Sequence, residues 1–221
     1  MSKAINETKP FAETLVVWQK KHGRNHLPWQ NTQDPYRVWL SEIMLQQTQV
    51  STVLDYYAKF LQHFPTVADL AAASQDQVMG LWSGLGYYSR ARNLHQCAKD
   101  VMTKFGGAFP QTAQELMSLP GIGRSTAAAV ASFCFSERVA IMDANVKRVL
   151  TRVLGFDADL ASTKNERTLW DQATALLPSA AEVATAWWAL TLHQVMKGML
   201  TNAPPAPTKP DKVPMTVPTT V

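Results

Sequence analysis

The sequence predicts an all-α protein, and three observations lead to that fold class. Apolar residues recur at helical spacing, strand-like alternation is absent, and helix-start signals are frequent. Hydroxyl residues followed three positions later by Asp, Gln or Glu predict helix starts at Thr66, Ser74, Thr112 and Thr163. The 221 residues, 46% of them hydrophobic, suffice for a substantial core. We therefore expect roughly nine or ten helices joined by short turns.

The composition excludes several classes of protein. Lysine and arginine (21) exceed aspartate and glutamate (17), and the net charge of +4 is compatible with a nucleic-acid partner without being diagnostic. Cys97 and Cys134 are far apart and form no metal-ligand spacing, so neither a disulfide framework nor a metal site is expected. The N-terminus has no apolar signal core, and no apolar run approaches the ~20 residues of a membrane span. We expect a cytoplasmic protein.

The first large helix is expected to begin near Asp34, because Pro35 suits the first turn of a helix. Glu42 shares a face of that helix with Val38 and Leu45, so its carboxyl group lies in an apolar stripe. Burial there would raise its pKa, and a carboxylic acid that stays protonated near neutral pH can act as a general acid. Alternatively, Glu42 lies at the edge of the stripe and reaches solvent, because burying an unpaired acid is costly.

Polar and aromatic residues near this helix are candidates for ligand contacts. Arg24, Leu27 and Trp29 precede it, and Trp29 could stack on a planar ligand or serve as an apolar anchor. Gln46 begins a Gln-Gln-Thr-Gln run that could contact bases or sugars, or could simply be a solvated helix end. Tyr87 follows a glycine turn and precedes two arginines, so it could wedge into a base stack or pack in the core.

A Pro-Gly-Ile-Gly turn between two predicted helices is a candidate phosphate site. Gly121 and Gly123 would start the second helix without a side-chain cap, which leaves backbone amides available to an anion. Such contacts hold a nucleic-acid backbone but do not read its sequence. The alternative is an ordinary corner between two helices in which the glycines serve packing.

Asp143 stands at the start of a later helix, whose apolar stripe includes Val146, Val149 and Leu150. An aspartate in that position is most often an N-cap. The functional alternative is a carboxylate that the helix start places at a cleft and that the helix dipole keeps ionised. The sequence leaves both interpretations open.

Five segments, taken in order, resemble a single family. They are GRNHLPWQ, WLSEIMLQQTQV, LWSGLGYYSRARNL, LPGIGRSTAAAV and IMDANVKRVL. Together they resemble the adenine DNA glycosylases of the MutY type, within the helix-hairpin-helix, Gly-Pro-Asp superfamily that includes endonuclease III. The resemblance runs from Phe11 to Pro178 and implies base-excision repair on a two-lobed fold with a six-helix barrel.

The resemblance also implies the organisation of the chain. Residues 1–29 are expected to pack with the second lobe, and residues 30–136 to form the six-helix barrel with the helix-hairpin-helix. Residues 137–200 are expected to form the second helical lobe. Residues 201–221 are proline-rich and are expected to be disordered.

The family's chemistry, carried over by motif, gives each candidate residue a role. The substrate would be adenine opposite 8-oxoguanine or guanine in double-stranded DNA, flipped out of the duplex by a monomeric, nucleoid-associated enzyme. Glu42 would protonate adenine, Asp143 would stabilise the sugar cation, and Asn145 would orient Asp143. Arg24, Leu27 and Trp29 would line the adenine pocket, Gln46 and Tyr87 would fill or wedge the base stack, and Gly121, Gly123, Arg124 and Lys147 would hold phosphate.

One position distinguishes branches of the superfamily. Ser125 stands where the endonuclease III-like members carry a lysine that forms a Schiff base with the sugar. The resemblance therefore implies a monofunctional glycosylase, with Ser125 at the substrate site. An endonuclease III-like glycosylase and lyase is the alternative within the same superfamily.

The chain departs from the family pattern after the catalytic core. The family usually binds a [4Fe–4S] cluster through four cysteines, and no cysteine follows Cys134, so no cofactor is expected. The helix that would carry the family's adenine-holding acidic residue lacks it, and we expect no domain that reads 8-oxoguanine. Three explanations fit: a truncated or frameshifted copy altered from about Glu182, a divergent clusterless enzyme, or a catalytically impaired DNA-binding remnant.

Overall fold

The computed structural model describes residues 9–23, 25–179, 182 and 184–187, and in that part of the chain every regular element is a helix. This confirms the predicted all-α class. No helix among the described residues is long and apolar enough to cross a membrane. In chain order the helices are α1 (Lys9–His22), α2 (Pro35–Leu45), α3 (Val50–His63), α4 (Val67–Ala72), α5 (Gln75–Trp82), α6 (Ser89–Phe105), α7 (Ala113–Leu116), α8 (Arg124–Phe135), α9 (Ala144–Leu154) and α10 (Thr163–Ala175).

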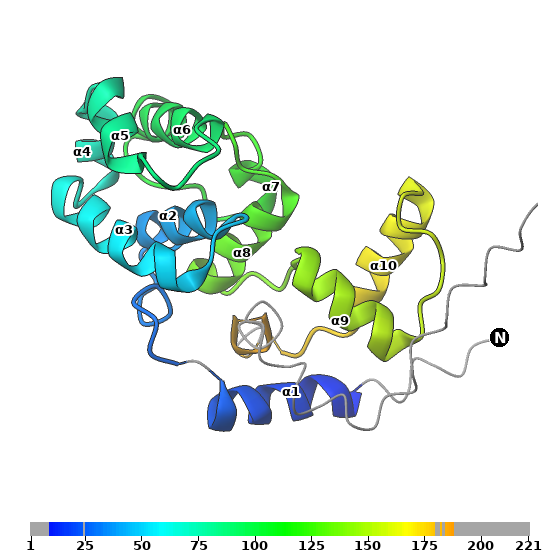
Figure 1. The fold of residues 1–221 in the computed structure, drawn as a ribbon. Helices are drawn as coiled ribbons and strands as arrows, with labels where there is room; N and C mark the ends of the chain where they lie inside the picture. The colour runs from blue at the N-terminus through cyan, green and yellow to red at the C-terminus, as the bar shows by residue number, and fades with distance from the viewer. Residues whose placement is uncertain (1–8, 24, 180–181, 183, 188–221) are drawn as a thin grey trace, which may run out of the picture.

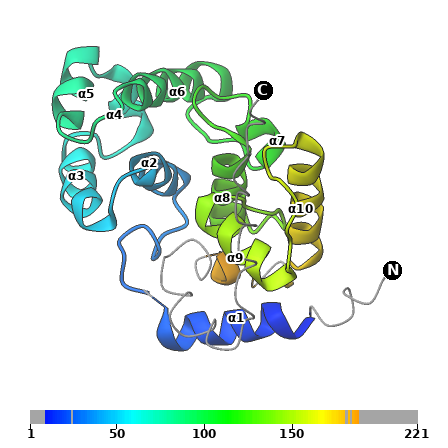
Figure 2. The same ribbon diagram turned by 45° about the vertical axis from the view of Figure 1, so that its right-hand side comes forward.

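The helices form two groups, which Figure 1 shows side by side. In the first group, α2 packs on α3, α6 and α8, while α4 and α5 pack on α6 and α7 packs on α8. In the second group, α9 packs on α10, and α1 lies beside them (Figure 2). The expected division into residues 1–29, 30–136 and 137–200 stays a proposal, and the tail expected over residues 201–221 lies outside the described residues.

Apolar side chains join α1 to the second group. Leu15 of α1, Leu150 of α9 and Ala173 of α10 line one small apolar pocket, together with the buried ring of Trp187. The N-terminal helix and segments more than a hundred residues away thus share one apolar contact region. Burial of this surface is the driving force that holds α1 in place.

The core of the first group is rich in aromatic side chains. Trp29, Trp39 and Trp82 are completely buried. The ring of Trp29 meets that of Tyr57 edge-on at 5.2 Å between centroids, and Trp39 meets Phe109 at 5.3 Å. Each such ring removes a large apolar area from water, so these contacts contribute heavily to the stability of the helix group.

Most of the predicted helix starts are confirmed. The hydroxyl groups of Thr66, Ser74 and Thr112 each accept a hydrogen bond from the backbone N–H three residues later. The capping residue predicted at Thr163 is wrong by one position, because Thr163 is the first residue of α10. Ser162 occupies the cap position, and its side chain makes no capping hydrogen bond.

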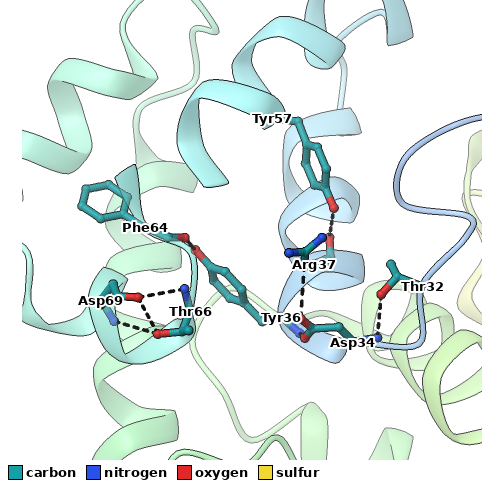
Figure 3. Close-up of polar contacts among 8 residues, drawn as sticks. All are labelled: Thr32, Asp34, Tyr36, Arg37, Tyr57, Phe64, Thr66 and Asp69. Carbon is teal, nitrogen blue, oxygen red and sulfur yellow. Dashed lines mark hydrogen bonds and ion pairs between the residues drawn. The ribbon is translucent and has the colours of Figure 1, made fainter. Parts of the chain in front are cut away.

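The N-terminal end of α2 is tied to α3, as Figure 3 shows. Asp34 caps the helix as expected, because its Oδ1 accepts a hydrogen bond of 2.9 Å from the N–H of Tyr36. The hydroxyl of Tyr36 donates to the carbonyl of Phe64 at 2.7 Å. The hydroxyl of Tyr57 donates to the carbonyl of Arg37 at 3.3 Å. These bonds fix where α2 begins and how it lies against α3.

The turn before α8 requires a glycine at one of its two glycine positions. Gly121 has φ +75°, and a Cβ added there would lie 2.7 Å from the Cβ of Asn93. Gly123 has φ −83°, and a Cβ there would meet nothing within 4 Å. Close packing therefore explains Gly121, whereas Gly123 occupies the N-cap position of α8, where it offers no side chain to cap the helix.

We expect Gly121→Ala to lower the free energy of unfolding by about 1–3 kcal/mol, because it combines a left-handed backbone with a steric clash. Gly80→Ala, at an exposed position of α5 with nothing within 4 Å, is the matched control. It should raise stability by about 0.5–1 kcal/mol through helix propensity. Urea unfolding followed by tryptophan fluorescence measures both. Wild-type stability in Gly121→Ala would contradict the packing argument.

Candidate active site

Glu42 lies in the apolar stripe of α2, between fully buried neighbours. Val38, one turn before it, is completely buried, and Ile43 is 4% exposed. The residue as a whole is half-buried. Burial of its carboxyl group, with a smaller contribution from the charge of Asp143, raises the pKa of Glu42 to about 7. The structure thus combines the two interpretations that the sequence left open: the residue is only half-buried, yet its carboxyl group is desolvated enough to raise its pKa.

Asp143 is the N-cap of α9, and it also lies near Glu42. Its Oδ1 accepts a hydrogen bond of 2.7 Å from the N–H of Val146. Burial raises the pKa of Asp143, while hydrogen bonds from Val146 and Asn145 and the charge of Arg148 oppose that rise. The sequence predicted that the helix start would favour the ionised form of Asp143, and the hydrogen-bond donors there do so. It did not predict that burial would raise the pKa of this carboxyl group.

The two carboxyl groups have different environments, and different causes act on their pKa values. Asp143 accepts several hydrogen bonds that favour its ionised form, whereas desolvation is the main influence on Glu42. The negative charge of Asp143 raises the pKa of Glu42 further. Burial thus raises the pKa of both carboxyl groups, but for Asp143 hydrogen bonds and the charge of Arg148 offset part of that rise.

Side chains behind Asp143 hold its surroundings in place. The hydroxyl of Ser125, in the first turn of α8, accepts a hydrogen bond of 3.3 Å from the N–H of Met142. Nη2 of Arg148 donates to Oδ1 of Asn145 at 2.8 Å. The sequence indicated Ser125 and Asn145 but gave no sign of Arg148, because its contact depends on the geometry of one helical turn.

Gln46 and Tyr87 lie on the surface, at two turns of the first helix group. Gln46 is the exposed C-cap of α2, and its Nε2 donates to the hydroxyl of Thr126 at 3.4 Å. Tyr87 is 61% exposed, so packing in the core, the alternative for this residue, is excluded. Both side chains are in reach of a large ligand.

The two basic residues expected to bind phosphate are engaged with α10. The guanidinium of Arg124 lies over the ring of Trp170, with 3.8 Å between its carbon and the ring centroid. The ammonium of Lys147 forms an ion pair with Glu166. Glu166 and Trp170 lie one turn apart on α10, and the sequence gave no indication that they contact Lys147 and Arg124. The backbone amides that start α8 have no side-chain cap, as expected.

Two of the three residues expected to line an adenine pocket, Leu27 and Trp29, lie in the core. Leu27 is 2% exposed, and Trp29, 0% exposed, packs on Tyr57. The apolar-anchor interpretation therefore describes Trp29 in this structure, and a role for the two residues in base binding stays a prediction. Arg24 lies outside the described residues.

The cysteines of this chain do not fit the iron–sulfur cluster of the family. A [4Fe–4S] cluster is held by four cysteine thiolates, and the chain has two cysteines. Burial raises the pKa of both Cys97, in α6, and Cys134, in α8, to about 12, which disfavours the thiolate form that binds metal. No group of three or more His, Cys, Asp or Glu residues that could hold a metal occurs among the described residues.

Comparison with known proteins identifies the family. The model of the HhH-GPD superfamily base excision DNA repair proteins matches residues 40–174, which include Glu42, the glycine turn and Asp143. The chain belongs to this HhH-GPD superfamily. A thermostable thymine-DNA glycosylase of known structure superposes with a TM-score of 0.77 at 27% identity, covering 86% of this chain and 87% of that one.

The curated relatives of this HhH-GPD protein place it with the MutY type. The adenine DNA glycosylase of Buchnera aphidicola subsp. Baizongia pistaciae is 45% identical over 171 residues, covering 77% of this chain and 48% of that protein. The adenine DNA glycosylase of Mus musculus is 44% identical over 185 residues, covering 80% of this chain and 36% of that protein. These matches confirm the resemblance to the MutY type. The chain spans about half the length of these relatives, or less.

We expect the stability of Glu42→Gln relative to wild type to increase with pH. The folded-state pKa of about 7 lies above the ordinary value of 4.5, so wild type loses stability as the pH rises between these values. The glutamine variant does not titrate, so its free energy of unfolding does not show this decrease, which reaches up to about 3 kcal/mol in wild type. Urea unfolding at pH 5 and pH 8 measures the difference.

Glu13→Gln, on the exposed face of α1, is the matched control for this substitution, because it makes the same change at the surface. A stability difference between Glu42→Gln and wild type that is the same at both pH values would contradict the burial of this acid.

Proposed function

We propose that this chain is a DNA glycosylase that hydrolyses the N-glycosidic bond of adenine opposite 8-oxoguanine or guanine in double-stranded DNA. The observation that carries the proposal is the pair of Glu42 and Asp143, an acid whose pKa is raised to about 7 beside a hydrogen-bonded carboxyl group at a helix start. Membership of the HhH-GPD superfamily and the adenine DNA glycosylases among the relatives support the same reaction.

Glu42 would act as the general acid. Its proton goes to N7 of adenine, so the bond between N9 and C1′ breaks with its electron pair on a neutral leaving base. Asp143, as carboxylate, would stabilise the positive charge that develops on the sugar, and water then adds at C1′ to leave an abasic site. Two carboxyl groups divide glycoside hydrolysis in the same way. Asn145, which hydrogen-bonds to Asp143, would orient that carboxylate.

The target nucleoside must leave the base stack before it can reach Glu42. Gln46 and Tyr87 are exposed at two neighbouring turns and would occupy the space that the flipped nucleoside vacates. The uncapped amides after Gly123 would hold a backbone phosphate. Arg124 and Lys147 would join them only by exchanging their contacts with α10 for contacts with DNA.

Ser125 supports monofunctional chemistry. Its hydroxyl accepts a hydrogen bond from the backbone next to Asp143, and a serine has no amine with which to form a Schiff base. Hydrolysis by water, rather than strand cleavage through a covalent imine, is therefore the proposed course of the reaction.

We expect single-turnover release of adenine by wild type and a loss of about 10²–10⁴-fold in Glu42→Gln, the usual contribution of a general acid. The substrate is a duplex with one adenine–8-oxoguanine pair. The wild-type rate should fall as the pH rises through about 7, because the acid then loses its proton. Glu13→Gln should release adenine like wild type.

DNA binding, measured separately by fluorescence anisotropy, distinguishes the alternative function. Wild type and Glu42→Gln should bind the duplex alike, with an affinity that falls as salt increases. If both bind and neither releases adenine, the chain is a DNA-binding remnant and the proposed activity is wrong.

We expect borohydride to trap no covalent complex with the cleaved substrate, because the Ser125 position has no amine. Denaturing gel electrophoresis after reduction measures trapping and strand scission together. Efficient trapping that accompanies scission and depends on a lysine would instead assign the chain to the endonuclease III-like branch.

A further inference from the structure

The guanidinium of one half-buried arginine, Arg90, joins the two surface turns that carry Gln46 and Tyr87. Nη1 of Arg90, in the first turn of α6, donates to three backbone carbonyls at the C-terminal end of α2. The distances are 2.8 Å to Ile43, 3.2 Å to Met44 and 2.6 Å to Gln46. Arg90 thus satisfies carbonyl groups that a helix end otherwise leaves without partners.

The second amino group of the same side chain reaches the other turn. Nη2 of Arg90 donates to the carbonyls of Leu85 at 3.2 Å and Gly86 at 3.4 Å, and to the hydroxyl of Thr48 at 3.3 Å. All six acceptors are uncharged oxygen atoms. A planar guanidinium can hold acceptors in two directions at once, which the compact ammonium of lysine cannot do.

Both turns contain a residue in a rarely populated backbone conformation. Gln47, at the end of α2, has φ +57°, and Tyr87 has φ +49°. Such conformations persist only where the surroundings fix them. The guanidinium carbon of Arg90 lies 5.4 Å from the ring centroids of both Tyr87 and Trp82, so the side chain is held between the exposed turn and the core.

We propose that Arg90 is a positioning residue that locks these two turns into one rigid edge for extruding the target nucleoside. The inference rests on the proposed function, because that function requires Gln46 and Tyr87 to enter the base stack together. Through the C-terminal end of α2, the same contacts hold the helix that carries Glu42. Arg90 itself touches no reacting atom in this scheme.

Base extrusion can be measured without catalysis. The duplex carries 2-aminopurine, a fluorescent adenine analogue, opposite guanine, and the protein carries Glu42→Gln so that no base is released. Saturating protein should raise the fluorescence as the base unstacks. Adding Arg90→Lys should weaken this rise by about tenfold, because the strained turns lose the contacts that fix them. Adding Arg167→Lys, an exposed arginine of α10, is the matched control and should leave the rise unchanged.

A comparison of two substrates separates positioning from general loss of structure. In an otherwise wild-type protein, Arg90→Lys should slow single-turnover release of adenine paired in the duplex by about tenfold. Release of adenine opposite an abasic site, where the base is already unpaired, should slow by less than about threefold, because extrusion is then less costly. Equal slowing of both substrates would make Arg90 merely structural and would overturn the proposal.

The outcomes remain distinct from the failure of the proposed function. If wild type releases no adenine, the function is wrong, yet the fluorescence assay still tests the edge. The proposal is overturned if the Glu42→Gln protein does not raise the fluorescence. It is also overturned if the protein that carries both Glu42→Gln and Arg90→Lys raises the fluorescence as much as Glu42→Gln alone. If Arg90→Lys does not fold, Thr48→Val removes one acceptor of the same guanidinium and should weaken the rise by about twofold. No change in that variant would also overturn it.

Discussion

Helix α2 is fixed at both ends by hydrogen bonds to backbone carbonyl groups, and the position of Glu42 depends on both. At its beginning, the hydroxyl of Tyr36 donates a hydrogen bond to the carbonyl of Phe64, the residue after α3. The hydroxyl of Tyr57, in α3, donates to the carbonyl of Arg37 in α2. At its end, Arg90 of α6 donates hydrogen bonds to backbone carbonyls that have no partner within the helix. A buried acid requires such a scaffold, because a mobile helix would let the carboxyl group reach water and return to its ordinary pKa.

The candidate site separates two carboxyl groups by environment rather than by residue type. Glu42 lies on an apolar face, where few contacts favour its charge, and its pKa rises to about 7. Asp143 lies at a helix start, where N–H donors and a nearby arginine favour its charge against the same burial. The pKa values of the two groups are thus set by different causes, and the proposed mechanism assigns the roles of acid and carboxylate from that difference.

Helix α10 shapes the region behind the glycine turn and the start of α9. Trp170 lies under the guanidinium of Arg124 from α8, and Glu166 pairs with Lys147 from α9. Three helices thus meet through two cations, each held by a group of α10. A half-exposed ion pair such as Lys147–Glu166 contributes little stability, so the main effect of the pair is to set where the charge of Lys147 lies.

The sequence by itself determined the helical class and most helix starts, because local spacing and capping specify these features. It indicated Glu42 and Asp143 only as candidates, and the resemblance to the family, rather than spacing, gave them roles. Asp34 and Thr66 carry their capping signals within a few residues of the helix that they start. Only the tertiary structure decided that Trp29 packs in the core, that Tyr87 is exposed and that Arg90 joins two turns. Those contacts connect segments up to 47 residues apart, and no local pattern encodes which distant carbonyl a guanidinium meets.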